Sequence, residues 1–242
     1  DVFVSWKGIL EEVMKQFRQP AVIDERRKKH FVEFVMPNVP TLTEEEDGML
    51  ESVAGLEEKL YKKGKRVKGT LKEGIDKFLW REGDKVWGAF GVTVDKSAKG
   101  VLAEQFLYDT FEWSEEHFKN NGNLPRVIRN DFEGSRSMHF HAGVKVPAAT
   151  NRLFQNWFVW KEVKLENGRT SYMLAFVPLT EYPGGGFKDL SKEGFVLAET
   201  TGVYFINEIA PNVCRVTRIQ TVDLKFTCLL YTSDAADETC RV

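Results

Sequence analysis

Two histidines lie at a spacing that could form part of a metal site. His139 and His141 fall in the predicted strand 137–146, where alternate side chains share a face, so both imidazoles point the same way. Imidazole pairs of this kind are common zinc ligands, but no glutamate follows three or four residues later. The neighbouring side chains are apolar and must face the core. We therefore expect both histidines to face solvent and predict no metal site.

Other candidates for catalysis are weaker. The glycines at 184–186 lack the following Lys-Ser/Thr pair of a phosphate-binding loop. Cys214 has no histidine beside it in the sequence and is predicted to be a buried structural thiol. The acidic stretch 112–118 is typical of a solvated helix face, and no G-x-S-x-G motif is present. The residues give no support for catalysis, and we predict that the protein is not an enzyme and has no cofactor.

Composition and charge exclude several classes of partner. The chain has 242 residues, 42% of them hydrophobic, which is ample for one domain with a full core. Its 34 basic and 36 acidic residues are interspersed, which argues against nucleic acid as a partner. No apolar run reaches the ~18–20 residues of a transmembrane segment. The basic stretch 62–69 is predicted to be a solvated turn, with anionic lipid or nucleic acid as the alternative contact.

The C-terminal residues differ in character from the rest. Residues 228–238, CLLYTSDAADE, resemble one translated frame of a common sequencing-library adapter, so residues 227–242 are predicted to be non-native. Outside that tail Cys214 is the single cysteine, which cannot form an internal disulfide and indicates a cytoplasmic protein. The chain begins at Asp1 without a signal-peptide pattern, which suggests a fragment of a longer protein.

Apolar periodicity predicts helices first and then an antiparallel sheet. Helices are expected at 1–19, at 24–36 with Asp24 as the cap, and from 43 to 61 with a Thr43–Glu46 capping box. The predicted strands are 75–81, 86–95, 126–133, 137–146, 153–163, 170–179, 194–201, 202–209 and 212–224, with helices following Ser97 and at 111–119. This order is typical of an α+β fold.

The segment LFQNWFVW, residues 153–160, raises the question of function. It carries large apolar side chains on both alternating faces, as does 171–179, and the predicted helices are too few to cover two faces of a sheet. An internal cavity for an apolar ligand would resolve this, and so would a neighbouring domain.

Two segments resemble the START (StAR-related lipid-transfer) family. NRLFQNWFVWKEV, residues 151–163, is similar to the family's P-x-R-D-F strand and its aromatic continuation; Arg152 and Phe154 match, and Leu153 replaces the Asp. VCRVTRIQTVDL, residues 213–224, resembles the last strand, which normally leads into a long C-terminal helix. Residues 15–40 further resemble the end of a unit in multi-START proteins of algae and other protists.

The resemblance implies the helix-grip fold, a curved antiparallel sheet around a C-terminal helix with a lipid or sterol cavity between them. Residues 1–42 would then be the helical tail of a preceding unit plus a linker, 43–226 the START-like domain, and 227–242 the non-native tail. The C-terminal helix would be missing. We therefore expect an open apolar groove, with Phe154, Phe158 and Trp160 on its floor unless helix 1–19 fills it.

The resemblance also places an expected ligand site on the inward face. Arg215 and Arg218 lie on opposite faces of the last strand, and an inward arginine would meet a ligand head group or a buried carboxylate. The expected ligand-binding residues are Met138, Phe140, Val144, Arg152, Phe154, Phe158, Trp160, Tyr172, Leu174, Phe176 and Arg215.

Two functions fit this interpretation. The first is a non-catalytic lipid- or sterol-binding module of a larger intracellular protein. The second is an interaction repeat whose cavity has collapsed and which docks adjacent START-like repeats. A helix-grip enzyme is a third and weaker candidate function. The volume of the cavity discriminates the first two, since a filled interior favours the repeat.

Overall fold

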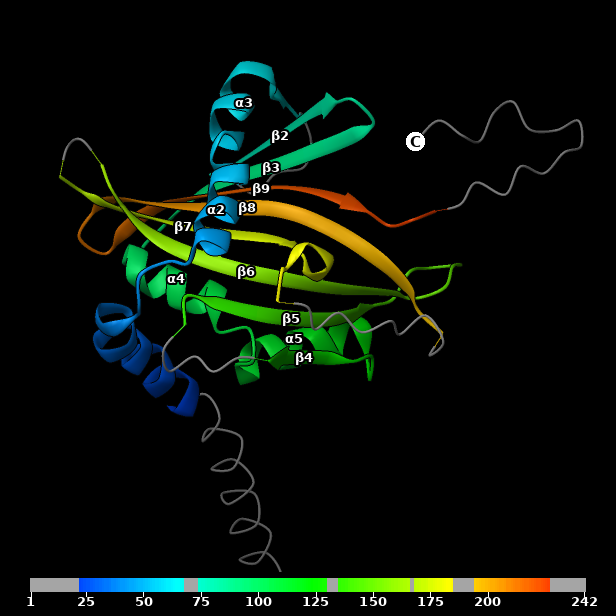
Figure 1. The fold of residues 1–242 in the computed structure, drawn as a ribbon, viewed down its shortest axis with the longest axis horizontal. Coiled ribbons are helices and arrows are strands. Elements are labelled where there is room, and N and C mark those ends of the chain that lie inside the picture. Colours follow the sequence, from blue (N-terminus) through cyan, green and yellow to red (C-terminus); the bar gives the residue numbers. More distant parts are fainter. Residues whose placement is uncertain (1–21, 68–73, 130–134, 166–167, 185–193, 227–242) are drawn as a thin grey trace, which may run out of the picture.

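The computed structural model describes residues 22–67, 74–129, 135–165, 168–184 and 194–226. Within them, nine strands form one curved, unclosed sheet in the order β1-β2-β3-β9-β8-β7-β6-β5-β4 (Figure 1). The strands are β1 (Lys65–Arg66), β2 (Ile75–Glu82), β3 (Lys85–Val94), β4 (Arg126–Arg129), β5 (Ser137–Val144), β6 (Arg152–Lys164), β7 (Thr170–Pro178), β8 (Val196–Ala210) and β9 (Val213–Asp223). Neighbours in this order pair antiparallel, as predicted.

Strand β8 differs from the sequence prediction, which divided it in two at Gly202. It is one strand of 15 residues, Val196–Ala210, and its first residues pair in parallel with the start of β6. Gly202 lies within it because the ring of Phe176 occupies the space where a side chain would project: a Cβ on Gly202 would lie 2.5 Å from the Phe176 Cζ. The glycine marks close packing on the sheet, which the sequence does not distinguish from a turn.

The helices begin where the caps predict. The Thr43 hydroxyl accepts a hydrogen bond from the backbone N–H of Glu46 at 3.2 Å, and the Glu46 carboxylate accepts one from the Thr43 N–H at 3.1 Å. The predicted helix 43–61 divides at Gly55 into α2 (Glu44–Ala54) and α3 (Leu56–Lys63). Ser97 caps α4 (Ala98–Phe106), as predicted, and Thr110 caps α5 (Phe111–Asn121).

Helices cover both faces of the sheet, which corrects the expectation that they are too few to do so. We call the face that α4 covers the inner face and the face that α2 covers the outer face (Figure 1). On β6, Phe158 and Trp160 belong to the core of the inner face, and Trp157 and Val159 to that of the outer face. The apolar residues on both alternating faces of LFQNWFVW are therefore explained by two cores on opposite sides of one strand.

The segment before α2 also packs on the inner face. Residues 22–30 are helical and continue into a π-helical turn, Phe31–Val35, and a 3₁₀ turn, Met36–Asn38. Phe31 and Met36 are buried in the core beneath α4. Asp24 was expected to cap its own helix, but it caps α5 instead. Its carboxylate accepts a hydrogen bond from the Phe111 N–H at 2.6 Å. The predicted helix 1–19 and the tail 227–242 lie outside the described residues.

Candidate lipid-binding groove

A groove of about 510 Å³ opens on the inner face, over β2, β3 and β9. Its described lining is apolar apart from one lysine, one arginine and one glutamine. The lining residues are Val67, Ile75, Lys77, Phe78, Leu79, Gly88, Ala89, Phe90, Arg218 and Gln220. None of them is acidic, and none is a histidine, cysteine or serine.

Strand register explains why the groove forms here. Leu79 pairs with Gly88, and Gly88 pairs with Gln220, so these three residues form one row across β2, β3 and β9. A Cβ on Gly88 would meet no atom closer than the Leu79 Cδ2, at 3.5 Å. The missing side chain leaves space in the middle of the row. Leu79 is 47% exposed at its rim, so this part of the inner face is open to solvent.

A second row leads from the groove into the filled core. It runs across six strands through residues that are paired with one another in turn. In order from the sheet edge they are Lys77, Phe90, Arg218, Tyr204, Leu174 and Trp160. Arg218 lies at the boundary, between exposed groove and buried aromatic core.

The arginine at this boundary lies against aromatic rings. Its guanidinium carbon is 5.0 Å from the ring centroid of Tyr204 and 5.6 Å from that of Phe176, within cation–π range. The Arg218 Nε is buried and has no hydrogen-bond partner in the described part of the chain. The Tyr204 hydroxyl is 3.0 Å from that of Tyr108, and burial raises the pKa of Tyr108 well above its usual value.

The inner face beyond Arg218 is filled, which corrects the expectation of an open groove floored by β6. Trp160 is 1% exposed, because Phe31 and α4 cover it. The expected lining residues that are buried in this core are Met138, Phe158, Trp160, Tyr172, Leu174 and Phe176. Phe140, Val144 and Phe154 are partly exposed. The structure thus brings most of the expected site together, but as side-chain packing.

The two arginines among the expected ligand-binding residues, Arg152 and Arg215, lie elsewhere. Arg152 is 4% exposed; it donates to the backbone carbonyls of Leu224 and Thr150, and its guanidinium lies over the Phe226 ring. Arg215 lies on the outer face, 2.6 Å from the Asp76 carboxylate. The inward arginine of β9 is therefore Arg218, because side chains alternate along the strand and Cys214 and Val216 also face inward.

The two histidines were expected to face solvent, but the structure covers both of them. His141 is 8% exposed, and its Nδ1 lies 3.5 Å from the Gln155 amide nitrogen. The ring of His139 lies 4.6 Å from that of Tyr182, and burial lowers its pKa. Both are on the outer face, as their parity requires, but the turn Leu179–Glu181 and Tyr182 cover that end of the sheet. The described residues include no group of three or more potential ligands placed to hold a metal ion.

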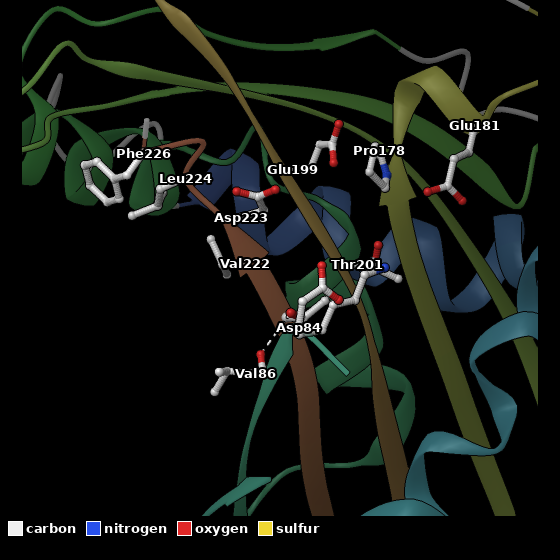
Figure 2. Close-up of a pocket in the computed structure, with 12 residues that line it drawn as sticks. Asp84, Val86, Pro178, Glu181, Glu199, Thr201, Val222, Asp223, Leu224 and Phe226 are labelled. Carbon is white, nitrogen blue, oxygen red and sulfur yellow. Dashed lines mark hydrogen bonds between the residues drawn. The ribbon is translucent and has the colours of Figure 1, made fainter. Parts of the chain in front are cut away.

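A different hollow, of about 500 Å³, lies where β3, β8 and β9 meet at one end of the sheet (Figure 2). Its described lining includes four carboxylates, of Asp84, Glu181, Glu199 and Asp223. Lys225 neutralises two of them, with its Nζ 2.8 Å from Glu199 and 2.7 Å from Asp223. The hydrogen bond from Lys225 lowers the pKa of Asp223. This charged lining suits water better than an apolar ligand.

Comparison with solved structures places the fold. Human STARD10 matches with a TM-score of 0.51 and 14% sequence identity, over 78% of this chain and 71% of that one. The chain has the START fold. Human StAR-related lipid transfer protein 5 also matches, with a TM-score of 0.49 and 14% sequence identity, over 75% of this chain and 84% of that one. The lipid transfer and protein localization domain of human StarD13 matches with a TM-score of 0.49 and 16% sequence identity, over 78% of this chain and 86% of that one. No protein-family model and no curated protein matches.

Within this START sheet, the groove residues on β2 and β3 were not predicted as a site. Their signal is visible in hindsight: Ile75, Lys77 and Leu79 alternate along β2, and the paired strand carries glycine at 88. Phe31 and Met36 were also missed, because the resemblance assigns residues 1–42 to a preceding unit and its linker rather than to this sheet. No helix in the described part of the chain is long and apolar enough to cross a membrane.

Proposed function

We propose that this chain is a non-catalytic lipid-binding module that holds its ligand in the inner-face groove. The observation that carries the proposal is the groove itself, an apolar groove of about 510 Å³ between exposed Leu79 and half-buried Arg218. Apolar pockets of a few hundred Å³ with a few polar groups are typical of small-molecule sites. The START fold, which this chain shares with human STARD10, supports the same conclusion, because START stands for StAR-related lipid transfer.

A non-catalytic role is supported by the lining. The described groove residues supply no carboxylate, imidazole, thiol or serine hydroxyl that could act as a nucleophile or a general base. Arg218 and Lys77 can bind and orient an anionic group, because a guanidinium and an ammonium donate hydrogen bonds and have no acceptor atom.

The finer assignments are also proposals. We propose a lipid as the ligand, with a sterol as one candidate, and a larger cytoplasmic protein with adjacent START-like repeats as the setting. The boundary at 42/43 would then separate the tail of a preceding unit from this one. Burial of Phe31 and Met36 in the inner-face core supports a role for that tail in covering this sheet. The proposed adapter origin of 227–242 is independent of the groove.

An interaction repeat is the second candidate function. The observation that favours it is the packing beyond Arg218, where Phe158, Trp160 and Leu174 leave the inner face filled. In that case the groove would receive a side chain of an adjacent repeat rather than a lipid.

Lipid extraction from the purified protein tests the first proposal. Gly88→Leu directs a side chain into the groove, and Gly48→Leu is the matched control, because a Cβ at Gly48 meets nothing within 4 Å and α2 lies on the outer face. We expect mass spectrometry to find lipid at a stoichiometry near one with the wild type and Gly48→Leu, and several-fold less with Gly88→Leu. Equal lipid in all three proteins, or none in the wild type even after incubation with lipid vesicles, would refute the proposal.

A further inference from the structure

We propose that the groove selects an amphiphile with an anionic head group, a carboxylate or a phosphate, bound at Arg218 with its tail along β2 and β3. This rests on the proposed function and goes further by naming the class of ligand. The inference comes from the charge of the groove, which is apolar and purely cationic over its described lining.

The charge of Arg218 is not neutralised by the described residues. None of the ion pairs among them includes Arg218, whereas Arg215, three positions earlier on the same strand, is 2.6 Å from Asp76. Arg218 is half-buried and its Nε is fully enclosed. Enclosing part of a guanidinium without an anion is unfavourable, and the aromatic faces of Tyr204 and Phe176 compensate only in part. A ligand carboxylate or phosphate would supply the missing counter-charge through charge-assisted hydrogen bonds.

A second cation lies in the same row. Lys77 pairs with Phe90, and Phe90 pairs with Arg218, so the two cations flank one aromatic ring across two strand spacings, about 10 Å. Lys77 is exposed and forms no ion pair with any described residue. It would attract an anionic head group to the groove, and Arg218 would hold it at the inner end, next to the Gln220 side chain.

The apolar part of the groove fits the tail. Ile75, Leu79 and Phe90 provide its walls, and Gly88 leaves the channel between them open. The filled core beyond Arg218 blocks deeper entry, so the head group stops where the cation lies. A sterol or another neutral lipid would leave the Arg218 guanidinium without a counter-charge, so among lipids the groove favours an anionic amphiphile.

Ligands that differ only in the head group test this. We would remove bound lipid from the full chain and measure affinity for palmitate, hexadecyl phosphate and hexadecanol. We expect both anions to bind at least 10-fold more tightly than the alcohol, and the two anionic arms distinguish a carboxylate from a phosphate preference. In Arg218→Gln the affinity for the anions should fall about 10- to 100-fold while that for hexadecanol changes little.

Arg215→Gln is the matched control, since it removes the same side chain from the other face of the same strand; it should change each affinity less than 2-fold. Lys77→Gln should weaken anion binding by a smaller factor, about 2- to 5-fold. If Arg218→Gln does not fold, this variant still tests whether the cations of the groove bind the anionic head group. Binding of hexadecanol as tight as palmitate by the wild type, with no effect of either groove variant, would overturn the inference and leave the proposed function intact. Binding of none of the three ligands, together with no lipid recovered from the purified wild type, would instead refute the proposed function.

Discussion

The ring of Phe31 meets that of Trp160 edge-on, with their centroids 6.1 Å apart. Phe31 also lies 5.5 Å from Phe106 of α4, so it joins the segment before α2 to both the sheet and its covering helix. Trp160 is 1% exposed as a result. The segment 31–38 is therefore part of the core of this unit, although the sequence resemblance places it in the tail of another.

Replacement of Phe31 tests this role. Phe31→Ala should lower the free energy of unfolding by about 3–5 kcal/mol, because it leaves a cavity between Trp160 and Phe106. The matched control is Phe34→Ala, which removes a ring that is 58% exposed three residues later and should cost about 0.5 kcal/mol. Denaturant unfolding of both variants measures the difference. Equal costs would show that residues 31–38 do not stabilise the sheet.

Gly202 should tolerate no side chain. In Gly202→Ala the new methyl would lie 2.5 Å from the Phe176 Cζ and closer still to the Ile219 carbonyl oxygen, so we expect a loss of about 1–3 kcal/mol. Gly88→Ala on β3 is the control, since its nearest neighbour is 3.5 Å away; the smaller entropy of its unfolded chain makes it neutral or slightly stabilising. Thermal unfolding measures the stability of both variants. If Gly202→Ala is as stable as Gly88→Ala, the side chain of Phe176 does not pack closely against Gly202.

The buried thiol of Cys214 should make stability fall at high pH. Burial raises the pKa of Cys214 to about 11, so between the pKa of an unfolded thiol, about 8.5, and pH 11 the unfolded state loses a proton that the folded state keeps. Unfolding is therefore favoured increasingly over this window, and below it the thiol contributes no pH dependence.

Comparison with Cys214→Ala isolates this effect from the titration of other groups. The free energy of unfolding of the wild type should fall by about 3 kcal/mol more than that of the variant between pH 8 and pH 11. If the two pH profiles are parallel, the thiol of Cys214 has the same pKa in the folded and unfolded states, and the prediction is wrong.

Removal of the tail should not affect the fold. A chain ending at Phe226 keeps the contact of that ring with Arg152, at 4.8 Å, and loses only residues proposed to be adapter-derived. We expect its melting temperature to change by less than about 1 °C. A further deletion of Leu224–Phe226 removes the carbonyl that accepts from the Arg152 Nε and should destabilise the protein by about 1–3 kcal/mol. A large loss of stability from the shorter deletion alone would contradict the adapter interpretation.

Local rules predicted much of the fold. The Thr43–Glu46 capping box, the Ser97 cap and the period-two strands could all be read from neighbouring residues, and parity assigned Phe158 and Trp160 to one face. The sequence did not show that α2 would cover the opposite face, since packing partners far apart in the chain have no local signature. It also could not decide which arginine of β9 faces inward until Cys214 and Val216 fixed the parity of the strand.

The sequence predicted an open apolar groove but not its position on the sheet. An open apolar channel was expected on the inner face, and it lies over β2, β3 and β9 because Phe31 and α4 fill the space above β6. The resemblance did not identify Phe31 as one of the residues that fill this space, because it assigned the segment before residue 43 to a preceding unit.

Photocrosslinking tests the central claim, that a lipid occupies the inner-face groove, most directly. The full chain would be irradiated with a fatty acid and the matching fatty alcohol, each carrying a diazirine near the end of the tail, and the adducts located by tandem mass spectrometry. We predict adducts on Ile75, Leu79 and Phe90 that are lost in Gly88→Leu and kept in Gly48→Leu. Adducts confined to the outer face or to the charged hollow at Glu199 and Asp223, or no adducts with either probe, would contradict the account.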